Sequence, residues 1–449
     1  MPMNSVASLG PAFLRHAVLH GGMTQERIIE GQNRQLRRLI AYACEHVPYY
    51  RTLFDGHGLN PDAIRTRTDL AAVPITHREH VQSLPIQDTL ATGIEPAQLL
   101  AYTTSGSSGR PFTIRRTWNE ERALAAFRMR AMREHGLRFT DREANIRNLD
   151  HNNRWHTQRV LRVFQAMGLF RKVWLDCRLP VEEIFDALQR YRPDVLIGLP
   201  HVLSRVAQIV LAGGRSQIHP RFVAVGGEVL TPLMRRQISE AFCARVFNQY
   251  GSFECNLIAW ECRETGQLHT CDDGVIVEVL TNGKPAKPGE NGEVVVTNLH
   301  AFAMPFIRYR LGDMATQGFE RCPCGQPFAT ISNVQGRMVD YFQLPGGRWL
   351  HPYVIGDVLS REAGWWLRHY QVTQERTDRI VLRAVPAPMP PPQRVAELTA
   401  AVTSTLGPGI EFQVMLVPEI DVEPSGKFRV YRTMVREGPS HTAIQPECP

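Results

Sequence analysis

Apolar residues recur every three to four positions in two stretches of the first third of the chain, residues 24–54 and 119–135. This spacing places them on one face of an amphipathic helix, so we predict a helix in each stretch. From about residue 143 the pattern changes to short apolar runs, such as residues 194–200, that alternate with helix-like stretches. Strands that alternate with helices predict βαβ units and a parallel sheet.

Beyond residue 270 the apolar runs are separated by glycine and proline turns instead of helices, as in residues 274–280 and 292–299. This pattern predicts antiparallel strands. After about residue 340, strand-like runs on either side of a helical stretch at 393–406 predict a small α+β unit. The predicted fold class is therefore α/β: a large N-terminal domain with parallel sheets flanked by helices plus a β-rich subdomain, and a small α+β C-terminal domain.

The composition is that of an ordinary globular protein, with 449 residues, 43% of them hydrophobic and 21% charged. No apolar run approaches the roughly 18 residues that a membrane-spanning helix needs. The first residues lack the basic and apolar segments of a signal peptide. The nine cysteines are an odd number, which argues against a disulfide framework. We expect a cytoplasmic protein with no membrane partner.

The charge balance is mild, with 51 basic residues against 44 acidic ones. Arginines cluster at 128–133 and 235–236 without interleaved aromatic residues or a DNA-reading motif, so we expect solvated helix faces and no nucleic-acid partner. The lysines are Lys172, Lys284, Lys287 and Lys427. A chain that otherwise uses arginine keeps a lysine where a compact point charge is needed. Lys284 and Lys287 lie in an ordinary turn, so Lys427 is the candidate.

The strongest local signal is a run of small and hydroxyl residues that starts at Tyr102 and reads Tyr-Thr-Thr-Ser-Gly-Ser-Ser-Gly-Arg-Pro-Phe-Thr. Its two glycines free the backbone, so that successive N–H groups and hydroxyls can converge on a phosphate. It is not a Walker A loop, because the lysine of that motif is absent. A flexible surface turn is the alternative. The candidate phosphate-binding residues are Thr103, Thr104, Ser105, Gly106, Ser107, Ser108, Gly109 and Arg110.

Further segments follow this loop in the order of the adenylate-forming (ANL) ligase superfamily, which the chain resembles. The segments are His46-Val47-Pro48-Tyr49-Tyr50, Gly226-Gly227-Glu228, Tyr250-Gly251-Ser252-Phe253-Glu254, Arg308-Tyr309-Arg310-Leu311-Gly312-Asp313, Gly336-Arg337 and Ser425-Gly426-Lys427. The phenylacetate–coenzyme A ligase and capsule-biosynthesis (CapK-like) branch is the most similar. The resemblance implies an N-terminal adenylate-forming domain at residues 1–338 and a mobile C-terminal lid at residues 339–449 that carries the catalytic lysine.

The resemblance also implies a role for each segment in joining a carboxylate to the α-phosphate of ATP, with release of pyrophosphate. Glu254 would hold Mg²⁺, Tyr250 would stack on adenine, and Asp313 would bind the ribose hydroxyls. Arg337 would contact ribose or phosphate, and Lys427 would bridge the carboxylate and the α-phosphate. The implied catalytic residues are Lys427, Glu254 and Arg337, and the implied ATP or AMP site also includes Gly227, Glu228, Gly251 and Ser252. Taken singly, each has an ordinary structural explanation, such as a turn or a core aromatic.

The implied partners are a small carboxylic acid, which we expect to be an aryl acid, and an acceptor nucleophile. Related enzymes hold the acid between the sheet and the Tyr-Gly-x-x-Glu segment, so the candidate substrate residues are Asn148, His151, His201 and Phe253. Coenzyme A is the leading acceptor. Residues 344–355 replace the glycine-rich, thiol-facing stretch of phenylacetate ligases, so an amine or another non-thiol nucleophile is the alternative. A catalytically silent binding protein is a third hypothesis, and a homodimer is left open.

Four residues have the spacing of a structural metal site. Cys322-Pro-Cys324-Gly can present two sulfurs to one ion, and Cys262 and His269 would complete a tetrahedral set. Similar positions in the ligase branch imply a structural Zn²⁺ without a catalytic role. Cys271 is a competing ligand, and buried thiols without a metal are the alternative.

Overall fold

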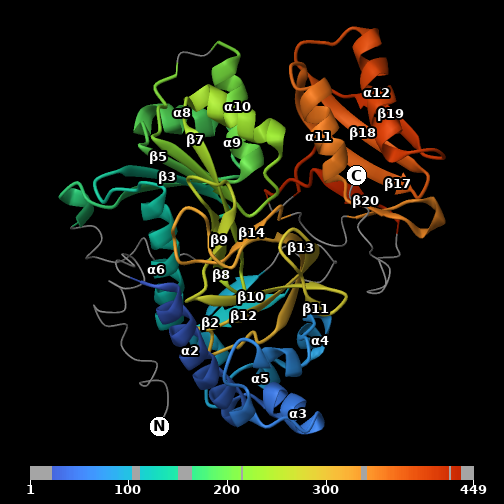
Figure 1. Ribbon diagram of the computed structural model, residues 1–449. Coiled ribbons are helices and arrows are strands. Elements are labelled where there is room, and N and C mark those ends of the chain that lie inside the picture. The colour runs from blue at the N-terminus through green and yellow to red at the C-terminus, as the bar shows by residue number, and fades with distance from the viewer. Residues whose placement is uncertain are drawn as a thin grey trace.

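The computed structural model describes residues 23–103, 112–149, 164–213, 216–334, 341–423 and 426–435. Helices surround a long central sheet, and a smaller C-terminal unit, residues 341–435, packs beside one end of that sheet (Figure 1). No helix in the described ranges combines the length and the apolar character that crossing a membrane requires.

The first predicted helix is in fact two helices, α2 (Gln25–His46) and α3 (Pro48–Gly56). Thr24 caps α2 by accepting a hydrogen bond from the backbone N–H of Arg27. Pro48 ends α2, because a proline holds the residue before it in an extended conformation and lacks the N–H that the helix needs. The short helices that follow are α4 (Arg78–Ser83) and α5 (Ile86–Thr89), with single 3₁₀ turns at Pro61–Ala63, Asp69–Ala72 and Pro96–Gln98.

A hairpin of β1 (Leu100–Thr103) and β2 (Thr113–Arg116) leads into α6 (Trp118–Glu134), the second predicted helix. A capping box fixes the start of α6, since Thr117 and Glu120 each accept the other's backbone N–H. The apolar face of α6 packs on one side of the parallel strands, where Met132 meets Ala224 and Phe247.

The predicted parallel strands are present and neighbour one another in the order β7-β6-β5-β3-β4. Their bounds are β3 (Arg142–Arg147), β4 (Arg171–Asp176), β5 (Val195–Gly198), β6 (Phe222–Gly226) and β7 (Arg245–Ser252). The side away from α6 is covered by α8 (Val181–Tyr191), α9 (Pro200–Leu211) and α10 (Pro232–Phe242). Burial on both faces explains why these strands are continuous apolar runs.

The antiparallel strands predicted after residue 270 are also present, but they extend the same sheet instead of forming a separate one. β7 pairs antiparallel with β8 (Asn256–Glu261), so the twelve strands form one continuous sheet. The remaining strands are β9 (Leu268–Thr270), β10 (Val275–Thr281), β11 (Lys284–Pro285), β12 (Asn291–Asn298), β13 (Tyr309–Gln317) and β14 (Thr330–Ser332).

The C-terminal unit has the predicted α+β composition. Its main sheet has the order β19-β18-β17-β20, and two helices accompany it. The elements are β15 (Phe342–Gln343), a 3₁₀ turn at Pro345–Gly347, β16 (Trp349–Leu350), α11 (Tyr353–Glu362), β17 (Leu367–Arg376), β18 (Arg379–Pro386), α12 (Pro392–Leu406), β19 (Glu411–Leu416) and β20 (Tyr431–Thr433). A proline-rich segment, residues 387–391, connects β18 to α12.

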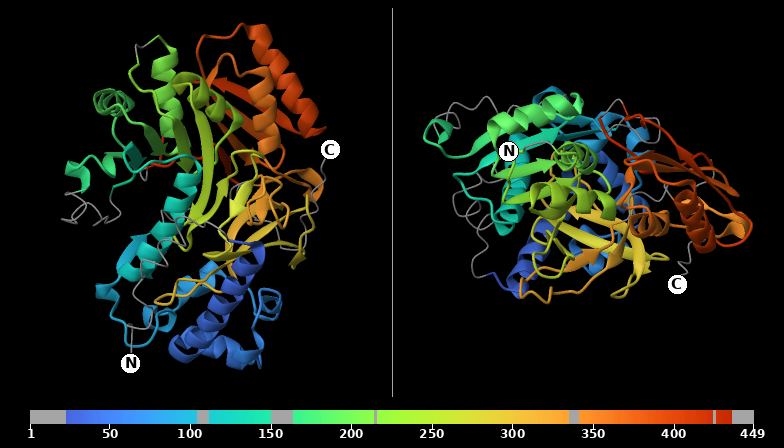
Figure 2. Two further views of the ribbon diagram at one scale, coloured as in Figure 1. Left: turned by 60° about the vertical axis from the view of Figure 1, so that its left-hand side comes forward. Right: turned by 90° about the horizontal axis from the view of Figure 1, so that it is seen from above.

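One apolar cluster joins the C-terminal unit to the rest of the molecule. It contains buried side chains of β3 and α9, such as Ile146 and Leu203, together with Phe342 and Phe428 of the C-terminal unit. Both views of Figure 2 show this unit packed along one side of the larger one. The two parts of the chain therefore share buried surface in this arrangement.

Candidate active site

The predicted motifs meet at the edge of the central sheet where the parallel strands end. β6 ends at Gly226, and the neighbouring strand β7 contains Tyr250. A Cβ atom on Gly226 would lie 2.5 Å from the carbonyl oxygen of Gln249, so only glycine permits this approach. Ligands of α/β proteins bind at the carboxyl ends of parallel strands. The edge is therefore the place where the fold would position a substrate.

The Tyr-Gly-x-x-Glu segment forms the tight turn between β7 and β8. A β-bulge lies at Gly251, where a Cβ atom would overlap the carbonyl oxygen of Asn256. The hydroxyl of Ser252 accepts a hydrogen bond of 3.2 Å from the backbone N–H of Cys255. These constraints fix the turn and place the side chains of Phe253 and Glu254 at the sheet edge.

Two hydrogen bonds connect this turn to β13. The Tyr250 hydroxyl donates to the Asp313 carboxylate at 2.7 Å, and the Tyr309 hydroxyl donates to Glu254 at 3.3 Å. Burial, with the nearby Asp313 charge, raises the pKa of Tyr250 well above its ordinary value. Glu254 is 5% exposed. The structure thus brings together the three residues predicted for adenine, ribose and Mg²⁺.

The C-terminal unit brings Lys427 to the same edge. The ammonium nitrogen of Lys427 lies 6.0 Å from the centre of the Phe253 ring. Gly426, just before it, has a φ of +77°, and a Cβ atom there would lie 2.6 Å from the Cys177 sulfur. A glycine is therefore needed at this position both for the backbone conformation and for close approach to the larger unit.

An aromatic pair lies beneath the lysine. The Tyr102 ring stacks on Phe253, with 6.1 Å between centroids. The guanidinium of Arg116 lies 4.7 Å from the Tyr102 ring centre, donates to the backbone carbonyl of Phe253, and pairs with Glu121 at 3.3 Å. Arg116 therefore contacts both Tyr102 and Phe253 and restricts their positions. Thr103 ends β1 at this pair, and Thr104, Ser105, Gly106, Ser107, Ser108, Gly109 and Arg110 lie outside the described residues.

Sequence reasoning missed Arg147, the last residue of β3. Its guanidinium lies 3.8 Å from the ring centre of Trp174 in β4. Burial, together with the positive charge of Arg128, lowers its pKa to about 9, while Tyr102 and Glu121 act in the opposite direction. The signal that could have found it is a charged residue at the carboxyl end of a predicted parallel strand.

The candidate substrate residues are distributed differently. Asn148 follows β3 and is half-buried, and Phe253 lies under Lys427. His201 is the second residue of α9, and its Nδ1 lies 2.7 Å from the carboxylate of Glu228. His151 and Arg337 lie outside the described residues.

The four predicted metal ligands form one cluster. The candidate ligand atoms of Cys262, His269, Cys322 and Cys324 all lie within 4.8 Å of one another. The Cys262 and Cys322 sulfurs are 3.9 Å apart, and the Cys324 sulfur is 3.4 Å from Nε2 of His269. Two ligands at about 2.3 Å from a tetrahedral Zn²⁺ would be roughly 3.8 Å apart. The donor set and its spacing therefore fit a zinc ion.

Cys271 lies outside this cluster and has a different environment. Its sulfur accepts a hydrogen bond of 3.4 Å from Arg130, a fully buried residue of α6. The same guanidinium forms two hydrogen bonds to Asp273, at 2.6 and 2.7 Å. The structure thus places Cys271 among the partners of an ion pair rather than among the metal ligands.

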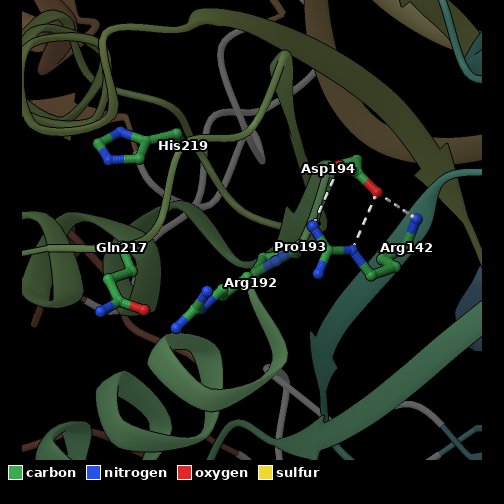
Figure 3. A pocket seen from close by; sticks show the side chains of 6 residues that line it. All are labelled: Arg142, Arg192, Pro193, Asp194, Gln217 and His219. Carbon is green, nitrogen blue, oxygen red and sulfur yellow. Dashed lines mark hydrogen bonds and ion pairs between the residues drawn. The ribbon is translucent and has the colours of Figure 1, made fainter.

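A surface pocket of about 330 Å³ lies at the opposite edge of the sheet, where β3 and β5 begin. Figure 3 shows the Arg142–Asp194 pair on one side of the view, Gln217 and His219 on the other, and Arg192 between them. The amino ends of the strands face this pocket, so it is separate from the edge that holds Tyr250 and Glu254.

Comparison with known proteins agrees with the predicted superfamily. Residues 88–304 match the model of the AMP-binding enzyme family. A phenylacetate-coenzyme A ligase of Thermus thermophilus is 26% identical over 361 residues, which cover 79% of this chain and 80% of that ligase. A fumarate–(S)-2,3-diaminopropanoate ligase of Enterobacter agglomerans is 24% identical over 59% of this chain and 64% of its own length.

Solved structures share the fold over most of the chain. A crystal structure of 2-hydroxyisobutyryl-CoA ligase in the postadenylation state aligns with a TM-score of 0.75 and 20% identity, covering 91% of this chain and 89% of that one. The same ligase in the thioesterification state aligns with a TM-score of 0.60. The chain therefore superposes better on the postadenylation structure of that ligase than on its thioesterification structure.

The fold and the family match define the class: the chain contains an AMP-binding domain and is an AMP-binding enzyme. Within this class it is a homologue of the phenylacetate-coenzyme A ligases, as its motifs predict. The prediction of an adenylate-forming ligase of this branch is confirmed.

Proposed function

We propose that the protein activates a carboxylic acid with ATP, forms an acyl-AMP with release of pyrophosphate, and transfers the acyl group to coenzyme A. The observation that carries the proposal is the position of Lys427 over Phe253, at the edge that also holds Glu254 and the Tyr250–Asp313 pair. Residues 339–449 would act as the mobile lid that brings this lysine to the N-terminal domain, residues 1–338. The homology to phenylacetate-coenzyme A ligases supports an aryl acid and a thiol acceptor.

The chain's own residues would supply positioning and charge. An acid bound beside the stacked rings of Tyr102 and Phe253 would present its carboxylate to Lys427, whose charge offsets the repulsion between carboxylate and α-phosphate. Asp313 would accept hydrogen bonds from the ribose. Glu254 would hold Mg²⁺, which neutralises phosphate charge when bound. Arg337 and the loop from Thr104 to Arg110 would complete the phosphate site.

We also propose that Cys262, His269, Cys322 and Cys324 bind a structural Zn²⁺. Four protein ligands fill a tetrahedral ion, so the site would leave no position for a substrate. Unpaired cysteines of this kind suit a reducing compartment, which supports a cytoplasmic location.

The test is pyrophosphate release with MgATP and a panel of aryl and aliphatic acids, with and without coenzyme A. We expect release with at least one acid and faster release with the thiol. Lys427→Ala should slow release at least ~100-fold without loss of thermal stability, because the side chain is half-buried at the edge of the interface. Lys284→Ala, at an exposed position of β11, is the matched control.

Three outcomes separate the alternatives. A rate of pyrophosphate release that coenzyme A does not change would favour an amine or another acceptor. Full activity of Lys427→Ala would contradict the proposed role of the lysine. If no acid supports pyrophosphate release, the result would favour a binding protein that has lost catalysis.

A further inference from the structure

The carboxylate of Glu228 connects the two units at a buried point. One oxygen lies 2.7 Å from Nδ1 of His201, and the other accepts a hydrogen bond of 2.7 Å from the backbone N–H of Phe428. The side chains of His201 and Glu228 are 3% and 5% exposed. A buried carboxylate is stable only when its oxygens are paired, so each of these contacts compensates a large desolvation cost.

The residue that Glu228 holds is the immediate neighbour of Lys427. The Phe428 ring has two imidazoles as neighbours, with ring centroids 5.9 Å away for His201 and 4.2 Å away for His369 of β17. Burial, with the nearby His201 and Arg205, lowers the pKa of His369 to about 3, so this ring is neutral at physiological pH. The ring contacts and the hydrogen bond together fix the backbone on the C-terminal side of the lysine.

The N-terminal side of the lysine is held as well. Gly426 packs against Cys177, which follows β4 of the larger unit. Lys427 therefore lies between two anchored residues, and its side chain reaches the Phe253 ring. The anchor at Gly426 is a steric contact, whereas the anchor at Phe428 depends on one carboxylate.

We propose that Glu228 and His201 are positioning residues that hold Lys427 in the adenylation arrangement by binding the backbone N–H of Phe428. His201 orients the Glu228 carboxylate through the contact at its Nδ1, and the carboxylate fixes the lysine loop. The contact joins the two units, so it must break when the lid moves for transfer to the thiol. The proposal deepens the function proposed above, and it assigns to Glu228 and His201 a common role in place of separate contacts to adenine and to the acid.

The first test needs no substrate. Amide hydrogen exchange of the full-length protein, followed by mass spectrometry, reports the Phe428 N–H directly. We expect the amide hydrogen of Phe428 to exchange at least ten times faster in Glu228→Ala than in the wild type. The control is Glu419→Gln, because Glu419 pairs with Arg205 across the same interface at 3.8 Å but is 75% exposed. Equal protection of Phe428 in wild type and Glu228→Ala would overturn the proposal.

The second test separates the two half-reactions, with the acid that gives the fastest pyrophosphate release and its synthetic adenylate. Glu228→Ala and His201→Leu should lower kcat for pyrophosphate release at least tenfold, with the KM for ATP within about threefold of the wild type. Transfer from supplied adenylate to coenzyme A should stay within threefold. Glu228→Gln, whose amide oxygen still accepts the Phe428 N–H, should recover part of the adenylation rate.

The outcomes distinguish this proposal from the proposed function. If the rates of both half-reactions fall equally in Glu228→Ala, Glu228 has a general structural role and the proposal is wrong. If only the KM for ATP rises, Glu228 has a nucleotide-binding role and the proposal is also wrong. If no acid supports pyrophosphate release in the wild type, the proposed function fails, while the exchange of Phe428 still tests the contact.

Discussion

The buried imidazole of His135, at the end of α6, has an environment that excludes its charged form. The ring stacks on Phe247 with 4.0 Å between centroids, and its Nε2 lies 2.9 Å from the carbonyl oxygen of Glu261. Among the described residues its Nδ1 has no hydrogen-bond partner. Burial lowers the pKa of His135 to about 4. A proton on Nδ1 would therefore be a buried, unpaired charge.

The stability of the protein should consequently fall in mild acid. The unfolded state binds a proton at this histidine below its ordinary pKa of about 6.5, whereas the folded state does so only below about 4. The contribution of the neutral His135 to the free energy of unfolding is therefore complete above pH 6.5 and is lost as the pH falls toward 4. Between pH 7 and pH 5 the free energy of unfolding should decrease by about 2 kcal/mol more in the wild type than in His135→Leu. Urea unfolding at both pH values measures this, and equal decreases would contradict it.

At the scale of elements, strand β8 separates the candidate metal cluster from the candidate active site. Glu254 lies just before β8 and Cys262 just after it. Six extended residues span about 20 Å, so the cluster is remote from the chemistry. The guanidinium of Arg130, in α6, lies 5.3 Å from the Trp260 ring centre and 4.8 Å from the Phe328 ring centre. These contacts hold α6 against the strands around the cluster.

Loss of the metal should therefore affect stability before activity. We expect about one zinc per chain in the purified protein and nearly none in Cys324→Ser, with a melting temperature lower by several degrees. Pyrophosphate release below that temperature should be retained within about threefold. Metal analysis and thermal unfolding measure this, with Cys243→Ser, an exposed cysteine, as the control. Equal zinc content in both variants would contradict the proposed site.

At the scale of the whole molecule, the candidate active site combines residues from both units. Phe253 and Glu254 belong to the larger unit, whereas Lys427 comes from the smaller one. The surface between the two units is largely apolar. Hydrogen bonds across it, such as the 2.7 Å bond from the Tyr353 hydroxyl to the Leu230 carbonyl, fix the orientation of one unit on the other. Conditions that weaken docking should therefore reduce adenylation without unfolding either unit.

Two glycines allow docking to be tested apart from backbone strain. Gly426 and Gly409 have similar φ angles of +77° and +82°, but only a Cβ atom on Gly426 would meet the larger unit, since the space around Gly409 is open. Both alanine variants should lose about 1 kcal/mol of stability from the left-handed conformation. Only Gly426→Ala should slow pyrophosphate release, by tenfold or more. Equal rates in the two variants would show that the contact with Cys177 does not position the lysine.

The sequence by itself determined most of the local structure and the identity of the family. The alternation of apolar runs with helices gave the parallel strands, glycine and proline turns gave the antiparallel ones, and the ordered motifs identified the ligase class. Such features depend on residue types at short spacings, which set helix and strand periodicity directly. The cysteine and histidine spacing likewise predicted the four residues that cluster, but it left Cys271 as a competing ligand, and only the structure separates Cys271 from the cluster.

Only the tertiary structure decided which distant residues share an environment. It joined both halves of the sheet through the β7–β8 pair, placed Arg147 among Tyr102 and Glu121, and paired His201 with Glu228. The hydrogen bond from Phe428 to Glu228 spans 200 positions in the sequence. No local pattern encodes such a contact, because it forms only where two parts of the chain bury their apolar faces against each other.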